Sequence, residues 1–174
     1  AWVFPTTPYP AIYATAINRT GSRSARAGII NPMDNIESYS TVRQTVAIPA
    51  DAVSATLRFW LYSISDEPAA QSSVPSHPLA ARIEDIALES DQQYALILNE
   101  NDDWIRTLVW QRTNDRAWTY HEFDMTVHAG DIIKVQFGAY NDGLDGVTAM
   151  YVDDVSLEIC HPATQSGTSM RRRR

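Results

Sequence analysis

Two adjacent carboxylates, Asp153 and Asp154, stand inside the segment YVDDVSLEIC (151–160), which otherwise has the composition of a β-strand. Side chains alternate along a strand, so one face is predicted for Tyr151, Asp153, Val155, Leu157 and Ile159. That face is mostly apolar and should point at the core. A carboxylate there loses its hydration, which is costly unless a cation or hydrogen-bond donors compensate it. We therefore expect a bound cation at Asp153 or a set of protein donors around it.

A second acidic segment, NDGLDG (141–146), lies just before that strand. Its carboxylates Asp142 and Asp145 could join Asp153 and Asp154 in a calcium site, because calcium prefers oxygen ligands. The spacing does not match an EF-hand loop. The alternative here is a plain turn with Asx hydrogen bonds. For Asp153 or Asp154 the alternative is capping of turn amides or pairing with an arginine.

Residue types that could carry catalysis are present without a recognisable arrangement. Neighbouring carboxylates such as Glu84 with Asp85 and Asp102 with Asp103 could serve a glycosidase, but no spacing singles out an acid and base pair. The segment HEFDM (121–125) lacks the helical H-E-x-x-H spacing of zinc peptidases, and no nucleophile elbow occurs. We therefore predict a protein without catalytic residues.

Aromatic side chains could bind a sugar by stacking if their rings face solvent. In the segment FWLY (59–62), alternation must turn either the first and third or the second and fourth residues outward. The candidates for stacking are Tyr62, Trp104 and Trp110. Burial in the core is the alternative for each candidate, because large aromatic residues are mostly buried.

Charge limits the partners of this chain. It has 174 residues and a formal net charge of −7, which includes the terminal run Arg171–Arg174. The remainder is near −11 (−7 − 4 = −11) and would repel nucleic acid and anionic membranes. No apolar run is long enough to span a bilayer, so membrane insertion is not expected. The single cysteine, Cys160, excludes an internal disulfide, and we expect a buried free thiol or a bond between molecules.

Apolar and β-branched segments between short turn sequences predict an all-β protein. The expected strands cover 39–48, 54–64, 93–99, 104–110, 117–125, 131–140 and 148–159. Short linkers favour two antiparallel sheets packed as a sandwich or jelly roll over a parallel α/β sheet. We predict one domain over 1–160, with a long loop insertion at 65–91 that is functional or disordered, and a linker-like tail at 161–174.

Several segments together resemble a known group of proteins. GSRSARAGI (21–29), YSTVRQTVAIPADAVSATLRFWLY (39–62), HAGDIIKVQFGAYNDG (128–143) and YVDDVSLEIC (151–160) follow the pattern of bacterial extracellular jelly-roll modules. These are similar to carbohydrate-binding modules and galactose-binding-like domains, and often accompany secreted peptidases or glycosidases. The match covers roughly 20 to 160 and lies mainly in structural positions.

The resemblance implies a two-sheet sandwich without an active site and, commonly, a structural calcium ion. In such modules the first Asp of the DDV element tends to ligate calcium, which makes Asp153 the leading ligand. The position of Trp118 is usually in the core in the family pattern, so the resemblance implies that Trp118 packs there. The family pattern usually opens with a strand like N-G-G-F-E before a Trp such as Trp2, whereas this chain begins at Ala1. We expect a sandwich that lacks its own first strand. Either the strand was lost from an excised fragment, or the tail or a neighbouring subunit fills the gap.

These observations predict a non-catalytic extracellular module for binding or adhesion, with carbohydrate as ligand and calcium as a structural ion. One alternative is a subunit of an extracellular filament or sheath, a homopolymer assembled by strand donation between subunits. In that case a neighbouring subunit should bury Trp2, Phe4 and Tyr9. The other alternative is an accessory domain of a secreted hydrolase.

Overall fold

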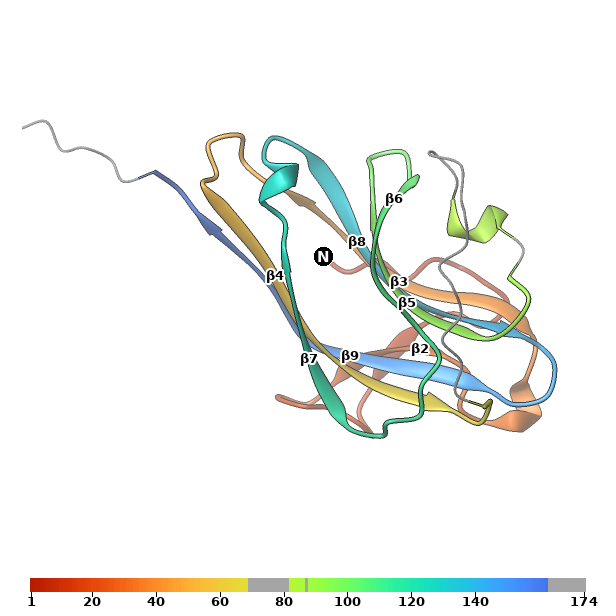
Figure 1. Cartoon of the computed structure of the whole chain (residues 1–174). Helices are drawn as coiled ribbons and strands as arrows, with labels where there is room; N and C mark the ends of the chain where they lie inside the picture. Colours follow the sequence, from red (N-terminus) through yellow and green to blue (C-terminus); the bar gives the residue numbers. More distant parts are fainter. Residues whose placement is uncertain (69–81, 87, 163–174) are drawn as a thin grey trace, which may run out of the picture.

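Two antiparallel β-sheets packed face to face form the protein, as a computed structural model shows (Figure 1). The structure describes residues 1–68, 82–86 and 88–162. The five-stranded sheet has the order β1-β2-β9-β4-β7 and the four-stranded sheet the order β3-β8-β5-β6. The strands are β1 Ile12–Ala14, β2 Ser24–Gly28, β3 Glu37–Ala47, β4 Ser54–Ser65, β5 Gln92–Leu98, β6 Trp104–Gln111, β7 Trp118–Asp124, β8 Ile132–Asp142 and β9 Thr148–Cys160.

Seven of the nine described strands lie where the sequence predicts them, and β1 and β2 lie outside the expected strands. In β4, Leu57, Phe59 and Leu61 are buried and the residues between them are partly exposed. Each strand expected from the sequence is present, so the prediction of an all-β sandwich is confirmed. The described helices are short 3₁₀ turns at η1 Pro32–Asp34, η2 Ile83–Asp85 and η3 Thr126–His128, and none could cross a bilayer.

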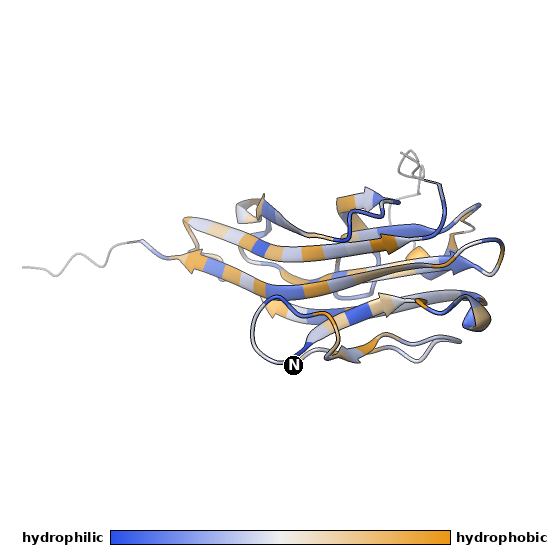
Figure 2. Ribbon diagram, turned by 90° about the horizontal axis from the view of Figure 1, so that it is seen from below, coloured by the Kyte–Doolittle hydropathy of each residue, from blue (hydrophilic) through white to orange (hydrophobic). Residues whose placement is uncertain are grey.

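Apolar side chains from both sheets meet between them and form the main core. Phe59 of β4 and Phe137 of β8 lie with ring centroids 4.8 Å apart, and both are fully buried. Burial of such a side chain stabilises the fold by about 1.5–3 kcal/mol. Figure 2 shows hydrophobic and hydrophilic residues alternating along the strands, so the residues between the core positions form the outer faces of the sheets.

A second apolar cluster lies on the outer face of the four-stranded sheet. β5 is buried along its whole length, because its outward side chains are covered as well. These outward residues are Tyr94, Leu96 and Leu98. Ile83 of η2 packs against them, so a described part of the predicted 65–91 insertion covers this face. Residues 69–81 and 87 of the insertion lie outside the described residues, as does the predicted tail beyond residue 162.

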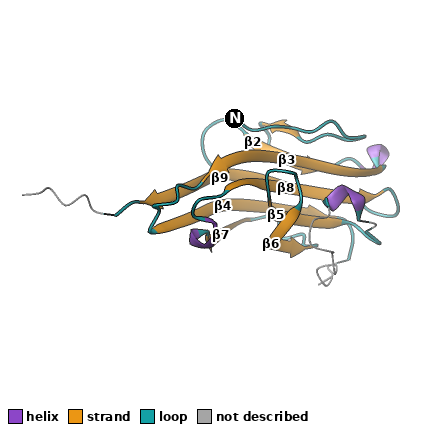
Figure 3. Cartoon of the chain, turned by 90° about the horizontal axis from the view of Figure 1, so that it is seen from above, coloured by secondary structure: helices purple, strands orange, loops and turns teal. Residues whose placement is uncertain are grey.

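The N-terminal segment packs against its own chain. Val3 forms an antiparallel bridge with Arg43 of β3, with N–H···O distances of 2.8 and 2.9 Å. The ring of Trp2 packs on Phe137 at a centroid distance of 6.0 Å. Figure 3 shows the N-terminus near β2 and β3. Among the described residues β1 is the first strand, and the expectation of a sandwich that lacks its own first strand stays a prediction.

Candidate functional site

Asp154 forms a β-bulge that divides β9 into two halves. Its φ is 49°, a left-handed conformation, and the register between β4 and β9 shifts at this point. The extra residue changes the face to which the following side chains point. Val152 packs in the core before the bulge and Val155 packs there after it. The prediction that Asp153 points at the core is therefore wrong, and Asp153 lies opposite Trp60 on the outer face.

Backbone amides compensate the carboxylate of Asp153. Its Oδ2 accepts hydrogen bonds from the amides of Arg19 at 2.7 Å and Thr20 at 3.3 Å. Its Oδ1 accepts one from the amide of Asp154 at 2.8 Å. These donors replace the water that the carboxylate loses on folding. A turn at residues 19–20 thus caps the carboxylate.

Asp154 is paired with the charge of Arg19. Arg19 Nη1 lies 2.5 Å from Asp154 Oδ2, and the Thr20 hydroxyl donates to the other carboxylate oxygen. The bond from Thr20, and then that from Arg19, hold the pKa of Asp154 below its usual value. The same guanidinium lies over the ring of Trp60, 3.8 Å from the ring centroid. Arg19 therefore supplies positive charge where calcium was expected.

This arrangement does not fit calcium at Asp153 and Asp154. Calcium needs free oxygen ligands, whereas these oxygens face N–H groups and a guanidinium. Over residues 1–68, 82–86 and 88–162, no group of three or more His, Cys, Asp or Glu side chains could hold a metal ion. The contacts of Asp153 and Asp154 are instead those of the alternative prediction, in which backbone amides cap a carboxylate and an arginine pairs with one. Calcium binding stays an untested prediction.

We expect Arg19→Ala to lower the free energy of unfolding by about 1–2 kcal/mol, because it removes an exposed ion pair and a cation–π contact, each worth up to about 1 kcal/mol. Arg23→Ala is the matched control, since Arg23 lies over the ring of Tyr13 at 4.2 Å and should cost under about 1 kcal/mol. Urea denaturation measures both. A chelator should leave the melting temperature of the unmodified protein unchanged, and a clear fall would show that calcium binds after all.

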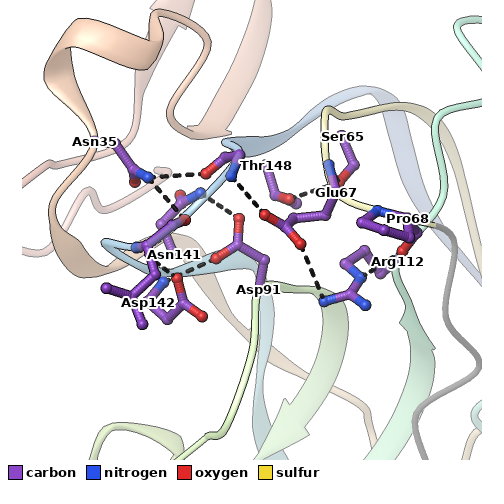
Figure 4. Close-up of polar contacts among 11 residues, drawn as sticks. Asn35, Ser65, Glu67, Pro68, Asp91, Arg112, Asn141, Asp142 and Thr148 are labelled. Carbon is purple, nitrogen blue, oxygen red and sulfur yellow. Dashed lines mark hydrogen bonds and ion pairs between the residues drawn. The ribbon is translucent and has the colours of Figure 1, made fainter.

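The acidic NDGLDG segment has the geometry of a plain turn. Asp142 Oδ1 accepts a hydrogen bond from the amide of Leu144 at 2.8 Å, which is the Asx bond of the alternative to calcium. Asp145 is exposed. Asn35 stabilises the turn, because its Nδ2 donates hydrogen bonds to the carbonyls of Leu144 at 3.0 Å and Gly146 at 2.8 Å (Figure 4).

A buried carboxylate, Asp91, holds the same turn from within the sandwich (Figure 4). Asn141 Nδ2 donates to Asp91 Oδ2 at 2.9 Å, and the amide of Asp142 donates to Oδ1 at 2.8 Å. Burial raises the pKa of Asp91 to about 6, although the Asp142 amide and the Thr148 hydroxyl oppose that rise. In the sequence Asp91 stands out only as one of several neighbouring carboxylates, with Glu89, and its role in holding this turn was missed. The available signal was a carboxylate placed directly before the apolar segment QQYALIL.

Four aromatic side chains, which we call the aromatic face, gather on the outer face of the five-stranded sheet: Trp60 and Tyr62 of β4, and Trp118 and Tyr120 of β7. The register places Trp60 opposite Tyr120 and Tyr62 opposite Trp118, with ring centroids 5.2 and 5.6 Å apart. Cross-strand aromatic pairs stabilise a sheet. Tyr120 is 48% exposed and the other three are partly exposed. The aromatic face is therefore accessible to solvent mainly at Tyr62, Trp118 and Tyr120, because Arg19 lies over the ring of Trp60.

Charged groups border the aromatic face around Arg58, the neighbouring outward residue of β4. Arg58 Nε lies 2.7 Å from a carboxylate oxygen of Glu122, and its Nη1 donates to Glu158. The Tyr120 hydroxyl donates to Glu122 at 2.6 Å, and this bond, followed by that of Arg58, lowers the pKa of Glu122. Rings beside a polar border have the composition of sites that combine stacking with hydrogen bonds.

The structure separates the three residues predicted to bind a ligand. Tyr62 lies in the aromatic face, whereas Trp104 and Trp110 stack on the outer face of the four-stranded sheet. Trp104 is fully buried, which was the alternative for it, and Trp110 is partly exposed. The prediction that Trp118 packs in the core is wrong. Trp118 faces outward because it shares a face of β7 with Tyr120.

The missed members of the aromatic face had a signal in the sequence. The pattern W-x-Y occurs at 60–62 and again at 118–120. Residues two apart on a strand share a face, so each segment carries an aromatic pair. The sequence does not show that β4 and β7 are neighbours, and that pairing brings the two aromatic pairs together.

Buried polar groups on the outer face of the four-stranded sheet have no hydrogen-bond partner among the described residues. They include the Thr41 hydroxyl, both amide atoms of Gln136 and the Tyr94 hydroxyl. All three side chains are fully buried. An unpartnered buried polar group costs about 1–3 kcal/mol. This face is therefore a second place where water or a ligand could satisfy protein groups.

The residues predicted to contact a neighbouring subunit have partners in their own chain. Trp2 packs in the main core. Phe4 packs edge-on against Tyr13 at 4.8 Å, and the Tyr9 hydroxyl accepts a hydrogen bond from Arg26. Their burial by a neighbour stays a prediction. The expected burial of Cys160 is wrong, because this last residue of β9 is an exposed free thiol.

No protein-family model and no curated protein sequence matches the chain. Solved structures with similar folds include TmCBM61 in complex with β-1,4-galactotriose, at 12% identity and a TM-score of 0.53, with 91% of this chain and 88% of that chain covered. A cleaved adhesin domain of Lys-gingipain from Porphyromonas gingivalis matches at 11% identity and a TM-score of 0.53, with 90% and 89% covered. The chain therefore has the sandwich fold of carbohydrate-binding modules, which confirms at the level of fold the resemblance found in the sequence.

Proposed function

We propose that the protein is a non-catalytic, extracellular carbohydrate-binding module that binds sugar on its aromatic face. The observation that carries the proposal is the pairing of β4 with β7, which places four partly exposed aromatic rings on one outer face. Pyranose rings have apolar faces, and stacking on an aromatic ring removes both surfaces from water. The polar groups at Arg58 and Glu122 would bind sugar hydroxyls beside the stacked rings.

The fold supports this proposal and suggests the first probe. TmCBM61 was solved with β-1,4-galactotriose, and the gingipain domain is described as an adhesin. We infer that the ligand is a polysaccharide, because two rows of rings along the strands can engage more than one sugar unit. Adhesion to a polysaccharide surface and an extracellular location are parts of the same proposal.

Affinity electrophoresis in β-1,4-galactan, xylan and soluble cellulose derivatives tests the proposal. The unmodified protein should be retarded by at least one of these polymers. Tyr120→Ala should weaken binding about tenfold, because it removes the most exposed ring and a loss of about 1.4 kcal/mol corresponds to that factor. Tyr120→Phe is the matched control and should retain most of the binding, since it keeps the ring.

Variants on the other sheet locate the site. Trp110→Ala alters the outer face of the four-stranded sheet and should leave binding unchanged. Loss of binding in Trp110→Ala but not in Tyr120→Ala would move the site to the face that carries Gln136 and Thr41. Failure of the unmodified protein to bind any polymer of the panel would contradict the proposed function.

A further inference from the structure

In the described part of the chain, half of β9 has a neighbouring strand on one side only. β4 pairs with β9 along nearly its whole length, from Ser54 opposite Cys160 to Ser65 opposite Thr148. On the other side, β2 pairs only with residues 149–152. Within residues 1–68, 82–86 and 88–162, no strand pairs with this second edge of β9 beyond Val152. Such an edge presents unpaired backbone N–H and C=O groups that can bind another strand.

The residues after the bulge carry an apolar stripe along this edge. Val155, Leu157 and Ile159 point towards the core but are only partly buried. Leu157 lies directly opposite Leu57, which is 1% exposed. The difference arises because Leu57 has a strand on both sides and Leu157 has one on a single side. The stripe therefore exposes apolar surface to solvent. An added strand would cover this surface.

A cavity follows the same seam between the two sheets. It has a volume of about 130 Å³, and its lining includes Trp2, Val46, Val155 and Leu157. Its walls come from β9, from the four-stranded sheet and from the N-terminal segment. The main core is thus incompletely closed along the free edge of β9, which is the place where burial of further apolar surface would stabilise the molecule most.

The sequence of this edge is self-complementary. In an antiparallel pair of two β9 strands centred on Leu157, Val155 of one copy lies opposite Ile159 of the other, and Ser156 lies opposite Glu158. Apolar residues then meet on the inward side and no like charges face each other on the outward side. Glu158 is paired with Arg58 of its own copy, and Arg58 also pairs with Glu122.

We propose that two copies of this chain associate through the free edges of β9, antiparallel and centred on Leu157. The two five-stranded sheets then form one continuous sheet across a twofold axis perpendicular to it. Each copy contributes the same edge, so the contact closes as a dimer and does not propagate into a filament. If the aromatic face binds polysaccharide as proposed above, both aromatic faces lie on the same side and bind one polymer bivalently.

Charge changes at residue 156 test the pairing. Ser156 is exposed, so substitution there should be tolerated by the fold. Ser156→Glu places like charges opposite Glu158 at two symmetric positions and should raise the dissociation constant of the dimer about tenfold, whereas Ser156→Lys should lower it. Sedimentation under reducing conditions over a range of protein concentrations measures both. Within one copy Ser156 lies opposite Arg58, so fold stability should change in the opposite direction to affinity.

A disulfide tests the register directly. With Cys160 replaced by Ser, Leu157→Cys should oxidise to a covalent dimer, because the two residues face each other at the twofold axis. Thr56→Cys is the control, since β4 has β7 and β9 as neighbours and offers no free edge. A monomer at all concentrations would overturn the proposal. So would a polymer that grows with concentration, or a dimer that neither responds to residue 156 nor crosslinks at residue 157.

Discussion

Gly28→Ala is expected to lower the free energy of unfolding by at least about 4 kcal/mol, or to prevent folding. A Cβ at this position would lie 2.2 Å from the carbonyl oxygen of Thr148 and 2.7 Å from Cα of Ala149. Both atoms belong to the backbone of β9, which cannot move away without breaking its pairing with β2. The φ of 89° adds strain that any residue with a Cβ would bear. Denaturation midpoints in urea measure the loss.

Gly21→Ala separates the two costs expected at Gly28, the steric contact of a Cβ and the strain of a positive φ. Gly21 also has a positive φ, of 65°, but nothing lies within 4 Å of a Cβ there. We expect a loss of only about 1 kcal/mol, from the left-handed conformation alone. Equal losses in the two variants would mean that the close approach of β2 to β9 carries no energetic weight.

The stability of the protein should increase as the pH falls from 7.5 to 4.5, by about 2 kcal/mol through Asp91. Burial raises the pKa of Asp91 in the folded state to about 6, from an ordinary value of 3.8. Between these values the folded state binds a proton that the unfolded state does not bind. Protonation therefore favours folding, and this contribution is lost as the pH rises through 6.

Asp91→Asn isolates this contribution, because asparagine has nearly the same shape and does not titrate. The amide can accept only one of the two hydrogen bonds now made by Asn141 and by the Asp142 backbone, so the variant should be less stable at pH 4.5. Burial lowers the pKa of His121, which opposes the trend by favouring folding at higher pH, but both proteins share that effect. The difference in stability between them should shrink by about 2 kcal/mol from pH 4.5 to 7.5. Parallel profiles would contradict a raised pKa at Asp91.

The sequence by itself determined the class of fold and seven of the nine described strands, but not the short strands β1 and β2. In β4 polar and apolar residues alternate from Ser54 to Phe59, and the structure continues the alternation of burial to Ser65. Alternation is a local property of neighbouring residues, and each turn depends on a few residues in sequence. For this reason the strand positions and the sandwich could be predicted without knowledge of any long-range contact.

Only the tertiary structure decided which way Asp153 and the aromatic side chains point and which residues they contact. The bulge at Asp154 turned Asp153 outward, and Arg19, which lies 135 positions away in the chain, supplied the charge expected from calcium. The order of strands brought Trp60 beside Tyr120 and, among the described residues, left half of β9 with a neighbouring strand on one side only. Bulges and lateral strand order depend on contacts between segments distant in sequence, and the periodicity of a single strand contains no information about them.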